Sequence, residues 1–428
     1  MEMMRKSKPI KYITAGILTL ACLLFMCFPV LAEGEEEVWP VPQSVETESV
    51  MIMELTTSTV LYEKDADSMR YPASTTKILT CLLALENSSM DEMVTFSERA
   101  VDLEEAASNI DAVAGETMSM KDCLYGLMLA SGNDVANAIA EHIGGSIEGF
   151  ADMMNERAAA IGCTGSHFEN PSGLFGDEHY TTARDMALIA QEAYKNSTFI
   201  DLITTSTYTM GPTNENDEPR TFRNWNELIN EDSDYYCPDV IGGKTGYLDE
   251  SGRCLVTYSQ RDNMTIITVQ YKGEYYGIFE EAKRLLDFTY TDFGIRNVSQ
   301  EERRFSYTSE KADVRLDPAA QIIAIKNRSI NDLDSNIVFA ADAEGAPRDL
   351  YATINYSYAG HDLGSANVYK EKAPSIRRPN FIHIYNIHIS YVIIFAVILA
   401  LILVVSYFTV SRRKRKRAPV RARSNRPG

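Results

Sequence analysis

The chain has 428 residues, 45% hydrophobic and 24% charged, a composition typical of a globular protein with two or three domains. The formal net charge is -19, but residues 1–32 carry four Lys or Arg and one acid, and residues 387–428 carry nine and no acid. The chain between them therefore has a net charge of -31, from 28 basic and 59 acidic residues. Such an acidic body repels phosphate backbones, so nucleic acid is excluded as a partner.

Residues 1–32 have the pattern of a secretory signal peptide. Basic residues precede an uncharged stretch at 12–32, which ends at Ala32 with small residues where signal peptidase requires them. An uncleaved anchor helix is the alternative, because the uncharged run approaches the length that spans a membrane. A lipoprotein is disfavoured, because Thr19 stands where the motif before Cys22 would carry Leu.

Residues 33–45 are acidic and contain two prolines, which predicts a short exposed leader. The region from 46 to 294 then combines helical and strand patterns. Strands are predicted at 49–55, 59–63, 253–259 and 264–271, and helices at 121–130, 134–142, 149–161, 182–194 and 279–288, with a further helix opening at Ser74. Helices enclosed between early and late strands predict an α+β fold whose sheet is completed by distant segments.

The pattern changes after residue 294. Short alternating runs separated by turn residues predict a small β-rich domain at 295–373, and they are clearest at 321–326, 337–341 and 351–358. Residues 374–388 are interpreted as a linker.

Residues 389–410 form a second uncharged run, which predicts a transmembrane helix. Six basic residues follow at once, at 412–417. By the positive-inside rule the tail at 411–428 lies in the cytoplasm, and everything between the signal peptide and this helix lies outside. The expected location is the cell membrane, crossed once.

Cysteine and histidine usage gives no support to a metal site. Five cysteines remain after the signal peptide, and their spacing matches no zinc site or disulfide framework. The six histidines are scattered and form no HExxH motif. No metal or other cofactor is therefore expected.

Three short motifs in the 46–294 region suggest catalysis. Each is weak alone: Ser74-x-x-Lys77, Ser131-Gly-Asn133 and Lys244-Thr245-Gly246. Their order and context strengthen them, because the first opens an apolar helix, the second lies between helices and the third enters a strand region.

The first motif has the chemistry of an activated nucleophile. Residues three apart on a helix project from one face, so Lys77 lies beside the hydroxyl of Ser74. A lysine near another cation and away from water is more easily neutral, and can then accept the serine proton. A helix cap and a solvated lysine are the alternative for this pair when it is considered alone.

The sequence resembles the serine-type D-Ala-D-Ala carboxypeptidases, the low-molecular-mass penicillin-binding proteins of the serine β-lactamase superfamily. The resemblance extends over about 49–294 and includes YPASTTK at 71–77, LASGND at 129–134, HFENPSGL at 167–174, TARDMAL at 182–188 and GKTGY at 243–247. It implies a β-lactamase/transpeptidase-like domain of a helical cluster and an antiparallel sheet. It also implies a peptidoglycan stem peptide ending in D-Ala-D-Ala as substrate, and β-lactams as inhibitors.

The resemblance also implies roles for the motif residues. Ser74 would be acylated with Lys77 as the base, and Ser131 would relay protons. The substrate-binding residues would be Asn133 for the substrate amide, Lys244 and Thr245 for the terminal carboxylate, Gly246 for close approach, and Tyr247, whose amide would complete the oxyanion hole with that of Ser74.

Two departures from the family pattern leave the proposed proton chemistry untouched. Leu248 replaces the Thr that often follows the K-T-G-Tyr run, and Ser251 replaces an Ala. Relatives commonly place a basic residue before the last helix of the catalytic domain, where this chain has Gly277, Ile278 and Phe279. Carboxylate recognition is then weaker, or is borrowed from Arg253 or Lys272.

Three rival functions are considered. A class A β-lactamase would need an E-x-x-L-N run between the second and third motifs, and none is present. A cross-link endopeptidase would use the same site and differs only in the room beyond the terminal residue. A non-catalytic peptidoglycan-binding scaffold would not require the intact motifs.

Overall fold

The protein is described here by a computed structural model covering residues 38–302, 314–340 and 347–370. The predicted signal peptide, linker, transmembrane helix and basic tail lie outside these residues. Among the helices of the described ranges, none combines the length and apolarity needed to cross a membrane.

A five-stranded antiparallel sheet forms the centre of the fold. Its strands, in spatial order, are β2 (Val60–Lys64), β1 (Ser49–Glu54), β9 (Met264–Gly273), β8 (Gly252–Arg261) and β7 (Val240–Leu248). β1 pairs with β9, so that Ile52 lies opposite Thr268 although they are far apart in the chain. The expectation that distant segments complete the sheet is confirmed.

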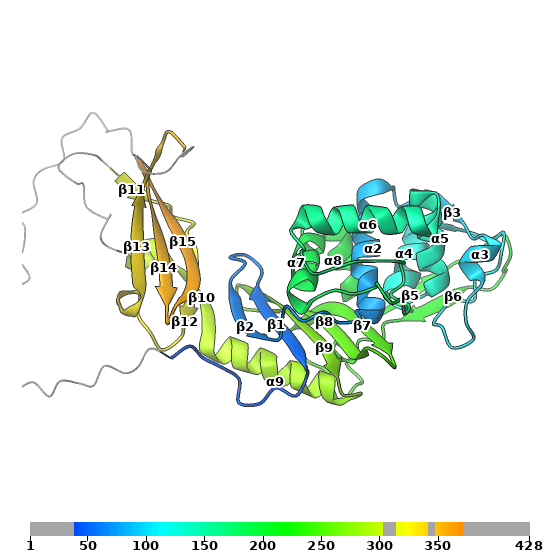
Figure 1. Ribbon diagram of the computed structural model, residues 1–428, viewed down its shortest axis with the longest axis horizontal. Coiled ribbons are helices and arrows are strands. Elements are labelled where there is room, and N and C mark those ends of the chain that lie inside the picture. Colours follow the sequence, from blue (N-terminus) through cyan, green and yellow to red (C-terminus); the bar gives the residue numbers. More distant parts are fainter. Residues whose placement is uncertain (1–37, 303–313, 341–346, 371–428) are drawn as a thin grey trace, which may run out of the picture. The chain divides into compact units, whose positions relative to one another are not determined.

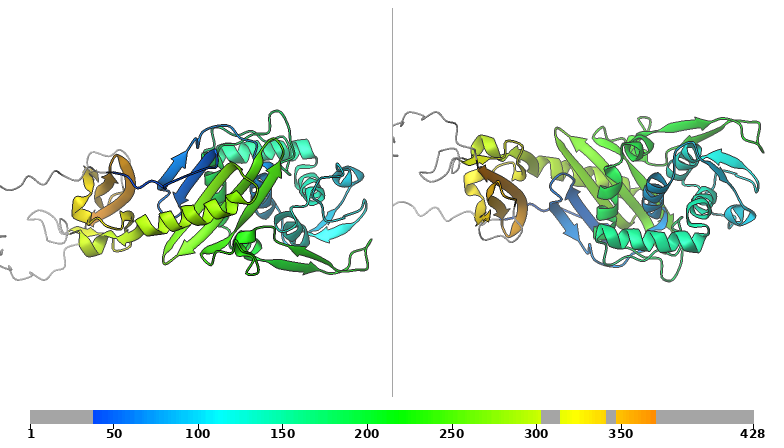
Figure 2. Two further views of the ribbon diagram at one scale, coloured as in Figure 1. Left: turned by 90° about the horizontal axis from the view of Figure 1, so that it is seen from below. Right: turned by 90° about the horizontal axis from the view of Figure 1, so that it is seen from above.

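Helices cover both faces of this sheet, a cluster on one side and α9 alone on the other (Figures 1 and 2). The cluster consists of η1 (Ala73–Thr76), α2 (Lys77–Asn87), α4 (Met120–Met128), α5 (Asn133–Gly144), α6 (Ile147–Ile161), α7 (Ala183–Tyr194) and α8 (Ser197–Thr204), and the helix opposite is α9 (Gly277–Asp292). The predicted helices at 121–130, 134–142, 149–161, 182–194 and 279–288 correspond to α4, α5, α6, α7 and α9.

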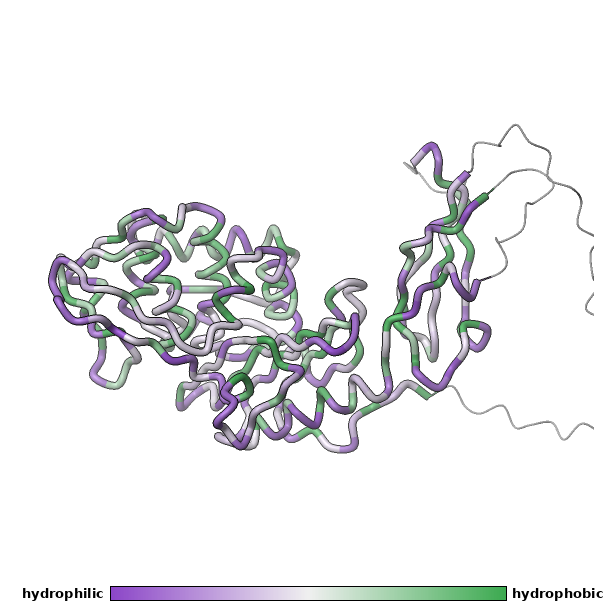
Figure 3. The backbone as a smooth tube through the Cα atoms, turned by 180° about the vertical axis from the view of Figure 1, so that it is seen from behind, coloured by the Kyte–Doolittle hydropathy of each residue, from purple (hydrophilic) through white to green (hydrophobic). Residues whose placement is uncertain are grey.

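The position of each helix follows from its pattern of apolar residues. α2 is buried on every side from Lys77 to Ala84 and contacts α4, α5, α7 and α8, which suits its almost continuous apolar sequence. α9 instead buries one stripe, including Leu285 and Leu286, against β8 and β9 and leaves Arg284 exposed. Hydrophobic and hydrophilic stretches accordingly alternate along the tube in the helical cluster (Figure 3).

Polar side chains fix where several helices begin. Each cap accepts a hydrogen bond from a backbone amide of the first turn: Ser119 for α4, Ser146 for α6, Thr182 for α7 and Asn196 for α8. Two glycines in the left-handed region, Gly145 and Gly162, end α5 and α6.

Several short elements are not predicted from the sequence. They are α8, the small strand pair β3 (Met93–Thr95) and β4 (Thr117–Ser119), α3 (Glu98–Val101), the hairpin β5 (Thr207–Met210) and β6 (Arg220–Arg223), and η2 (Glu227–Ile229). Tertiary contacts explain them better than local pattern does. The side chain of Arg220, for example, pairs with the buried carboxylate of Glu116 and so attaches the β5–β6 hairpin to the loop before β4.

Strands continue after α9, together with two short helical segments. These elements are β10 (Phe293–Asn297), α10 (Val298–Glu301), β11 (Val314–Leu316), β12 (Gln321–Ile325), η3 (Ile330–Asp332), β13 (Asp334–Phe339), β14 (Leu350–Tyr358) and β15 (His361–Lys370). β10 pairs with β12, and the other four strands form a sheet in the order β11-β15-β14-β13. The alternating runs predicted at 321–326, 337–341 and 351–358 correspond to β12, β13 and β14.

Candidate active site

The first motif lies where η1 passes into α2. Ser74 belongs to the 3-10 turn, and Lys77 is the first residue of α2. Ala73, just before Ser74, has a φ of +46°, an uncommon conformation for alanine that the surrounding packing must hold. Lys77 is completely buried, and its Nζ lies 2.9 Å from the Oγ of Ser74, as the spacing of the motif predicts.

The amine of Lys77 is held by groups from three parts of the chain. Besides the hydroxyl of Ser74, its Nζ donates to Oδ1 of Asn133 at 2.6 Å and to the carbonyl oxygen of Ser172 at 2.7 Å. These three acceptors match the three donors of an ammonium group. The side chain is therefore fixed in direction toward the serine.

The second motif occupies the turn between α4 and α5. Ser131 has a φ of +59°, which turns the chain sharply just before α5 begins at Asn133. Both side chains are almost completely buried. Ser131 Oγ accepts a hydrogen bond from Nζ of Lys244 at 3.0 Å, so the second and third motifs are in direct contact.

The third motif lies on β7, an edge strand of the central sheet. Lys244 is buried, Thr245 is half-buried and the side chain of Tyr247 is 48% exposed. A Cβ at Gly246 would stand 2.9 Å from the backbone nitrogen of Ser74, closer than side chains approach. Glycine is therefore required here for β7 to lie against the nucleophile.

Two buried cations share this site, and their pKa values reflect it. Burial, and then the charge of Lys244, hold the pKa of Lys77 well below its usual value, while Asp134 acts in the opposite direction. Burial lowers the pKa of Lys244 to about 7. Both shifts favour the neutral amine, which is the form that a general base for a serine requires.

Sequence reasoning assigned no role to several residues that support this site. Ser172 supplies the carbonyl that holds Lys77, and Gly173, with a φ of +83°, lies so close to Ala73 that a Cβ would meet its carbonyl oxygen at 1.9 Å. Both belong to the HFENPSGL run at 167–174. Because a backbone carbonyl can come from any residue type, only the Pro-Ser-Gly turn hints at this position.

His179 supports the turn that carries Ser74. Its Nδ1 accepts from the amide of Glu169 at 3.1 Å, and its Nε2 lies 3.0 Å from Oγ1 of Thr76. Burial lowers the pKa of His179 to about 3, so the ring is neutral and its Nε2–H donates to Thr76. The histidine orders η1 and contributes no charge near neutral pH.

Thr245 also lines a hollow of about 960 Å³ beside β7. Its wall includes Arg223, Trp225, Arg253 and Tyr275. Trp225 is 53% exposed and lies at this cleft. Lys272 lines a different hollow and pairs with Glu48 at 3.2 Å.

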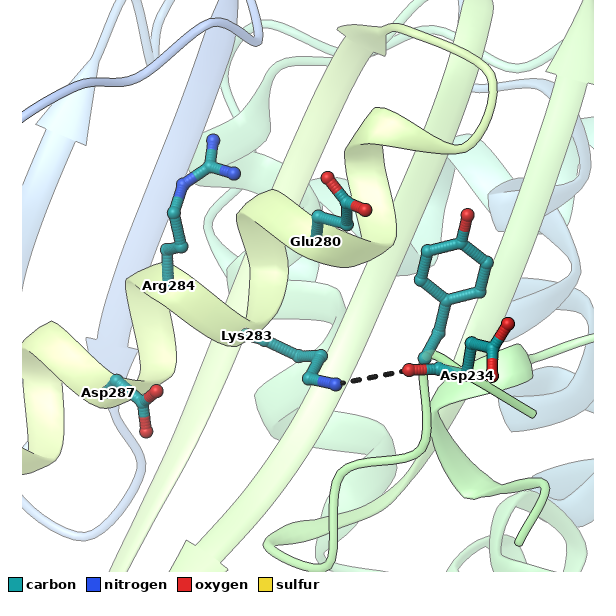
Figure 4. A pocket seen from close by; sticks show the side chains of 6 residues that line it. Asp234, Glu280, Lys283, Arg284 and Asp287 are labelled. Atoms are coloured by element: carbon teal, nitrogen blue, oxygen red, sulfur yellow. Dashed lines mark hydrogen bonds between the residues drawn. The ribbon is translucent and has the colours of Figure 1, made fainter. Parts of the chain in front are cut away.

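A further hollow lies beside α9 and contains none of the motif residues (Figure 4). It is lined by charged side chains and one tyrosine, and Lys283 donates to the carbonyl oxygen of Asp234 across it at 3.4 Å. Within the ranges the structure covers, no three His, Cys, Asp or Glu residues are arranged to hold a metal ion, and the five cysteines there are free.

Comparison with known proteins agrees with this arrangement. A sequence model of the D-alanyl-D-alanine carboxypeptidase family matches residues 36–274. The chain is similar to D-alanyl-D-alanine carboxypeptidase DacF of Bacillus subtilis, with 36% identity over 53% of this chain and 57% of the relative. It is also similar to the D-alanyl-D-alanine carboxypeptidase of Streptomyces sp. strain K15, with 34% identity over 49% of this chain and 75% of that one. The chain thus spans little more than half of the length of the Bacillus relative.

The fold is that of the same proteins. The crystal structure of D-alanyl-D-alanine carboxypeptidase DacD from Francisella tularensis aligns with a TM-score of 0.59 over 79% of this chain and 96% of that one, at 22% identity. This likeness concerns the fold alone, which is a mixed α/β fold of the transpeptidase type. Since the family model covers more than half of the chain and the three motifs meet around Ser74, the chain belongs to the D-alanyl-D-alanine carboxypeptidase family.

Proposed function

We propose that this protein is a serine-type D-Ala-D-Ala carboxypeptidase, which removes the terminal D-Ala from peptidoglycan stem peptides through an acyl-serine intermediate. One observation carries the proposal: a buried Lys77 lies 2.9 Å from the partly buried Ser74, beside a second buried cation that favours its neutral form. A purely structural lysine would not need this desolvated position, which costs stability while the amine is charged.

Acylation follows from the positions of the motif residues. Neutral Lys77 accepts the proton of the Ser74 hydroxyl as Oγ attacks the carbonyl carbon of the penultimate D-Ala. The amides of Ser74 and Tyr247 stabilise the negative charge that develops on the carbonyl oxygen. Asn133 holds the substrate amide, and Lys244 with Thr245 faces the terminal carboxylate.

The leaving amine needs a proton for the C–N bond to break. Ser131 lies two residues before Asn133, which is hydrogen-bonded to Lys77, and its hydroxyl accepts from Lys244. This hydroxyl gives a proton to the departing D-Ala and takes up the one that Lys77 received, so that Lys77 is neutral again. Water then attacks the acyl carbon and gives a proton to the neutral Lys77, which passes it to the Ser74 oxygen as the C–O bond breaks, so that the shortened peptide leaves and the serine hydroxyl is restored.

Acylation by penicillin tests this function. A fluorescent penicillin should give a stable single adduct with the chain spanning 33–386, detected by intact-mass spectrometry, and Ser74→Ala should give none. The wild type should also release D-Ala from a Lys-D-Ala-D-Ala peptide. A folded wild type without an adduct would overturn the enzymatic function and favour the non-catalytic scaffold.

The hollow beside Thr245 favours one additional substrate, a D-Ala cross-link between two stem peptides. Its volume of about 960 Å³ suits a ligand much larger than alanine. Incubation with a cross-linked muropeptide dimer should then yield monomers, and unchanged dimer would restrict the enzyme to terminal residues.

From the sequence of the remaining parts of the chain we infer that this activity is located at the cell surface. A signal peptide at 1–32 exports the chain, a leader at 33–45 precedes the catalytic domain at 46–294, and a small β-rich domain at 295–373 follows it. A linker at 374–388 leads to a transmembrane helix at 389–410 and a cytoplasmic tail at 411–428. These boundaries are supported by the hydropathy and charge of the sequence.

A further inference from the structure

The hollow beside Thr245 gathers aromatic side chains that are open to solvent. Six large aromatic side chains of the described residues are exposed, and three of them line this hollow. They are Trp225, Tyr275 and Tyr276, which are 53%, 51% and 56% exposed. Trp225 follows β6, whereas the two tyrosines lie between β9 and α9. Apolar rings that converge from distant segments on one open hollow mark a ligand-binding groove.

Contacts between these side chains hold the rings in fixed orientations. The guanidinium carbon of Arg253 lies 3.6 Å from the ring centre of Tyr275 and 4.8 Å from that of Tyr247. The rings of Tyr235 and Tyr276 are stacked, with 5.8 Å between their centres and 3° between their planes. Tyr275 and Tyr276 meet edge to face at 4.5 Å. A ligand therefore meets rings that are already ordered, which reduces the entropy lost on binding.

Polar side chains of both charges surround the rings. Arg223, Glu227 and Glu231 line the hollow, and no ion pair or hydrogen bond joins their side chains to another described residue. Arg253 likewise has no ion-pair partner there, and its Nε is a buried nitrogen without an acceptor. The lining holds two arginines and three acids, so neither sign dominates. This balance suits a neutral ligand with many hydrogen-bonding groups better than a polyanion or a polycation.

A sugar ring has the chemistry that this arrangement recognises. One face of the ring carries C–H groups, which pack on an aromatic ring, and the hydroxyl and acetamido groups at its edge exchange hydrogen bonds with carboxylates and guanidinium groups. An extended peptide is bound instead through backbone hydrogen bonds at an open strand edge, which β7 offers. The strand edge and the aromatic rings therefore fit different parts of peptidoglycan.

We propose that this hollow binds a sugar residue of a peptidoglycan glycan strand, stacked on Trp225 and Tyr276. The inference rests on the proposed function, because the stem peptides of the wall are attached to such strands. The polymer is then held at two places, at Ser74 through a peptide and at the aromatic rings through a sugar. The sugar site raises the affinity for the polymer and takes no part in bond breaking.

Trp225 itself reports whether the sugar site is occupied. The chain has two tryptophans, so Trp39→Phe leaves Trp225 as the only one. This change is combined with Ser74→Ala, which prevents acylation, and the protein is titrated with glycan strands freed of peptide by an amidase. We expect a saturable change in tryptophan emission with the strands, and none with a free stem peptide ending in D-Ala-D-Ala.

Release of D-Ala from two substrates tests the role of the rings in activity. Intact sacculi below saturation are compared with a free Lys-D-Ala-D-Ala peptide. We expect Trp225→Ala and Tyr276→Ala each to lower release from sacculi by about 3- to 10-fold, as for loss of a stacking contact, and to leave release from the free peptide unchanged. Trp225→Phe keeps a ring and should retain most of the activity on sacculi. Phe339→Ala, which removes a ring 42% exposed outside the hollow, is the matched control and should change neither rate.

Three results would overturn the proposal. The first is unchanged emission of Trp225 with glycan strands. The second is an emission change with the free stem peptide in place of the strands, which would assign the rings to peptide. The third is an equal loss on sacculi and on the free peptide in Trp225→Ala, which would make the ring structural. Thermal melting of each variant identifies unfolding as a separate cause, and the titration tests the site with both rings intact.

The titration also separates this inference from the proposed function. If peptide-free strands bind to the Ser74→Ala protein but the wild type releases no D-Ala, the sugar site stands and the proposed activity falls. If the wild type releases D-Ala but the strands do not bind, the activity stands and the sugar site falls.

Discussion

At the scale of single residues, the site depends on placing two lysines within one buried space. Lys77 and Lys244 come from different layers of the fold; burial disfavours the charged form of both, and the charge of Lys244 further disfavours that of Lys77. Asp134 acts in the opposite direction, because its negative charge favours the charged form of Lys77. It is itself buried and accepts hydrogen bonds from the amides of Ile110 and Val135. The balance of these charges sets the pH at which Lys77 can act as a base.

The pH dependence of acylation tests this balance. In the pH profile of the acylation rate, the rise on the acid side should report the loss of a proton from Lys77. This lysine must be neutral to activate Ser74. Lys244→Met removes a positive neighbour, so the pKa of Lys77 rises and the acid limb moves to higher pH. Asp134→Asn removes a negative one, so the limb moves to lower pH. The rate of adduct formation with fluorescent penicillin, measured against pH, gives both shifts; movement in the same direction in both variants would contradict the assignment of Lys77.

At the scale of elements, the nucleophile is held by a close contact between two turns. η1 carries Ser74, and the turn containing Ser172 and Gly173 packs directly on Ala73. Because Ala73 already has a φ of +46°, this contact maintains a conformation that the residue would not adopt alone. The geometry of the nucleophile is thus a property of two turns together.

Gly173→Ala should therefore reduce both stability and acylation. Its φ is +83° and the new Cβ would meet the Ala73 carbonyl oxygen, whereas Gly115 has a φ of +86° with no atom within 4 Å of a Cβ. Gly115→Ala isolates the backbone strain, about 1 to 2 kcal/mol of unfolding free energy. Gly173→Ala should cost more and slow adduct formation, as urea unfolding and the penicillin assay would show. If Gly173→Ala and Gly115→Ala changed the free energy of unfolding equally, and the rate of adduct formation equally, the turn contact would not position Ser74.

At the scale of the whole molecule, the residues proposed for catalysis and those proposed for membrane attachment lie in different parts of the chain. The body between the terminal segments carries a net charge of -31, and the basic residues of the last 42 positions lie beside an uncharged run. The motif residues all lie between 74 and 247, on elements supported by the central sheet and its helices. The proposed attachment to the membrane and the proposed catalysis therefore depend on different parts of the sequence.

Removing the C-terminal segment should change location without changing chemistry. The full chain should remain with membranes after a high-salt wash, because an apolar helix is not released by screening charges. A chain ending at residue 386 should be recovered in the soluble fraction and should form the penicillin adduct at the wild-type rate. Release of the full chain by salt would instead indicate attachment through its basic residues.

By itself, the sequence determined the helical cluster, the pairing of early with late strands and the residue types of the catalytic motifs. It could do so because amphipathic periodicity, helix caps and i, i+3 spacing are local properties. Only the tertiary structure decided which distant groups meet: Lys244 with Ser131, 113 residues apart, and the carbonyl oxygen of Ser172 with Lys77. It also placed Arg253, and not Lys272, in the hollow with Thr245. Such contacts depend on how strands and turns pack, and neither a backbone carbonyl nor a missing ion-pair partner leaves a pattern in the sequence.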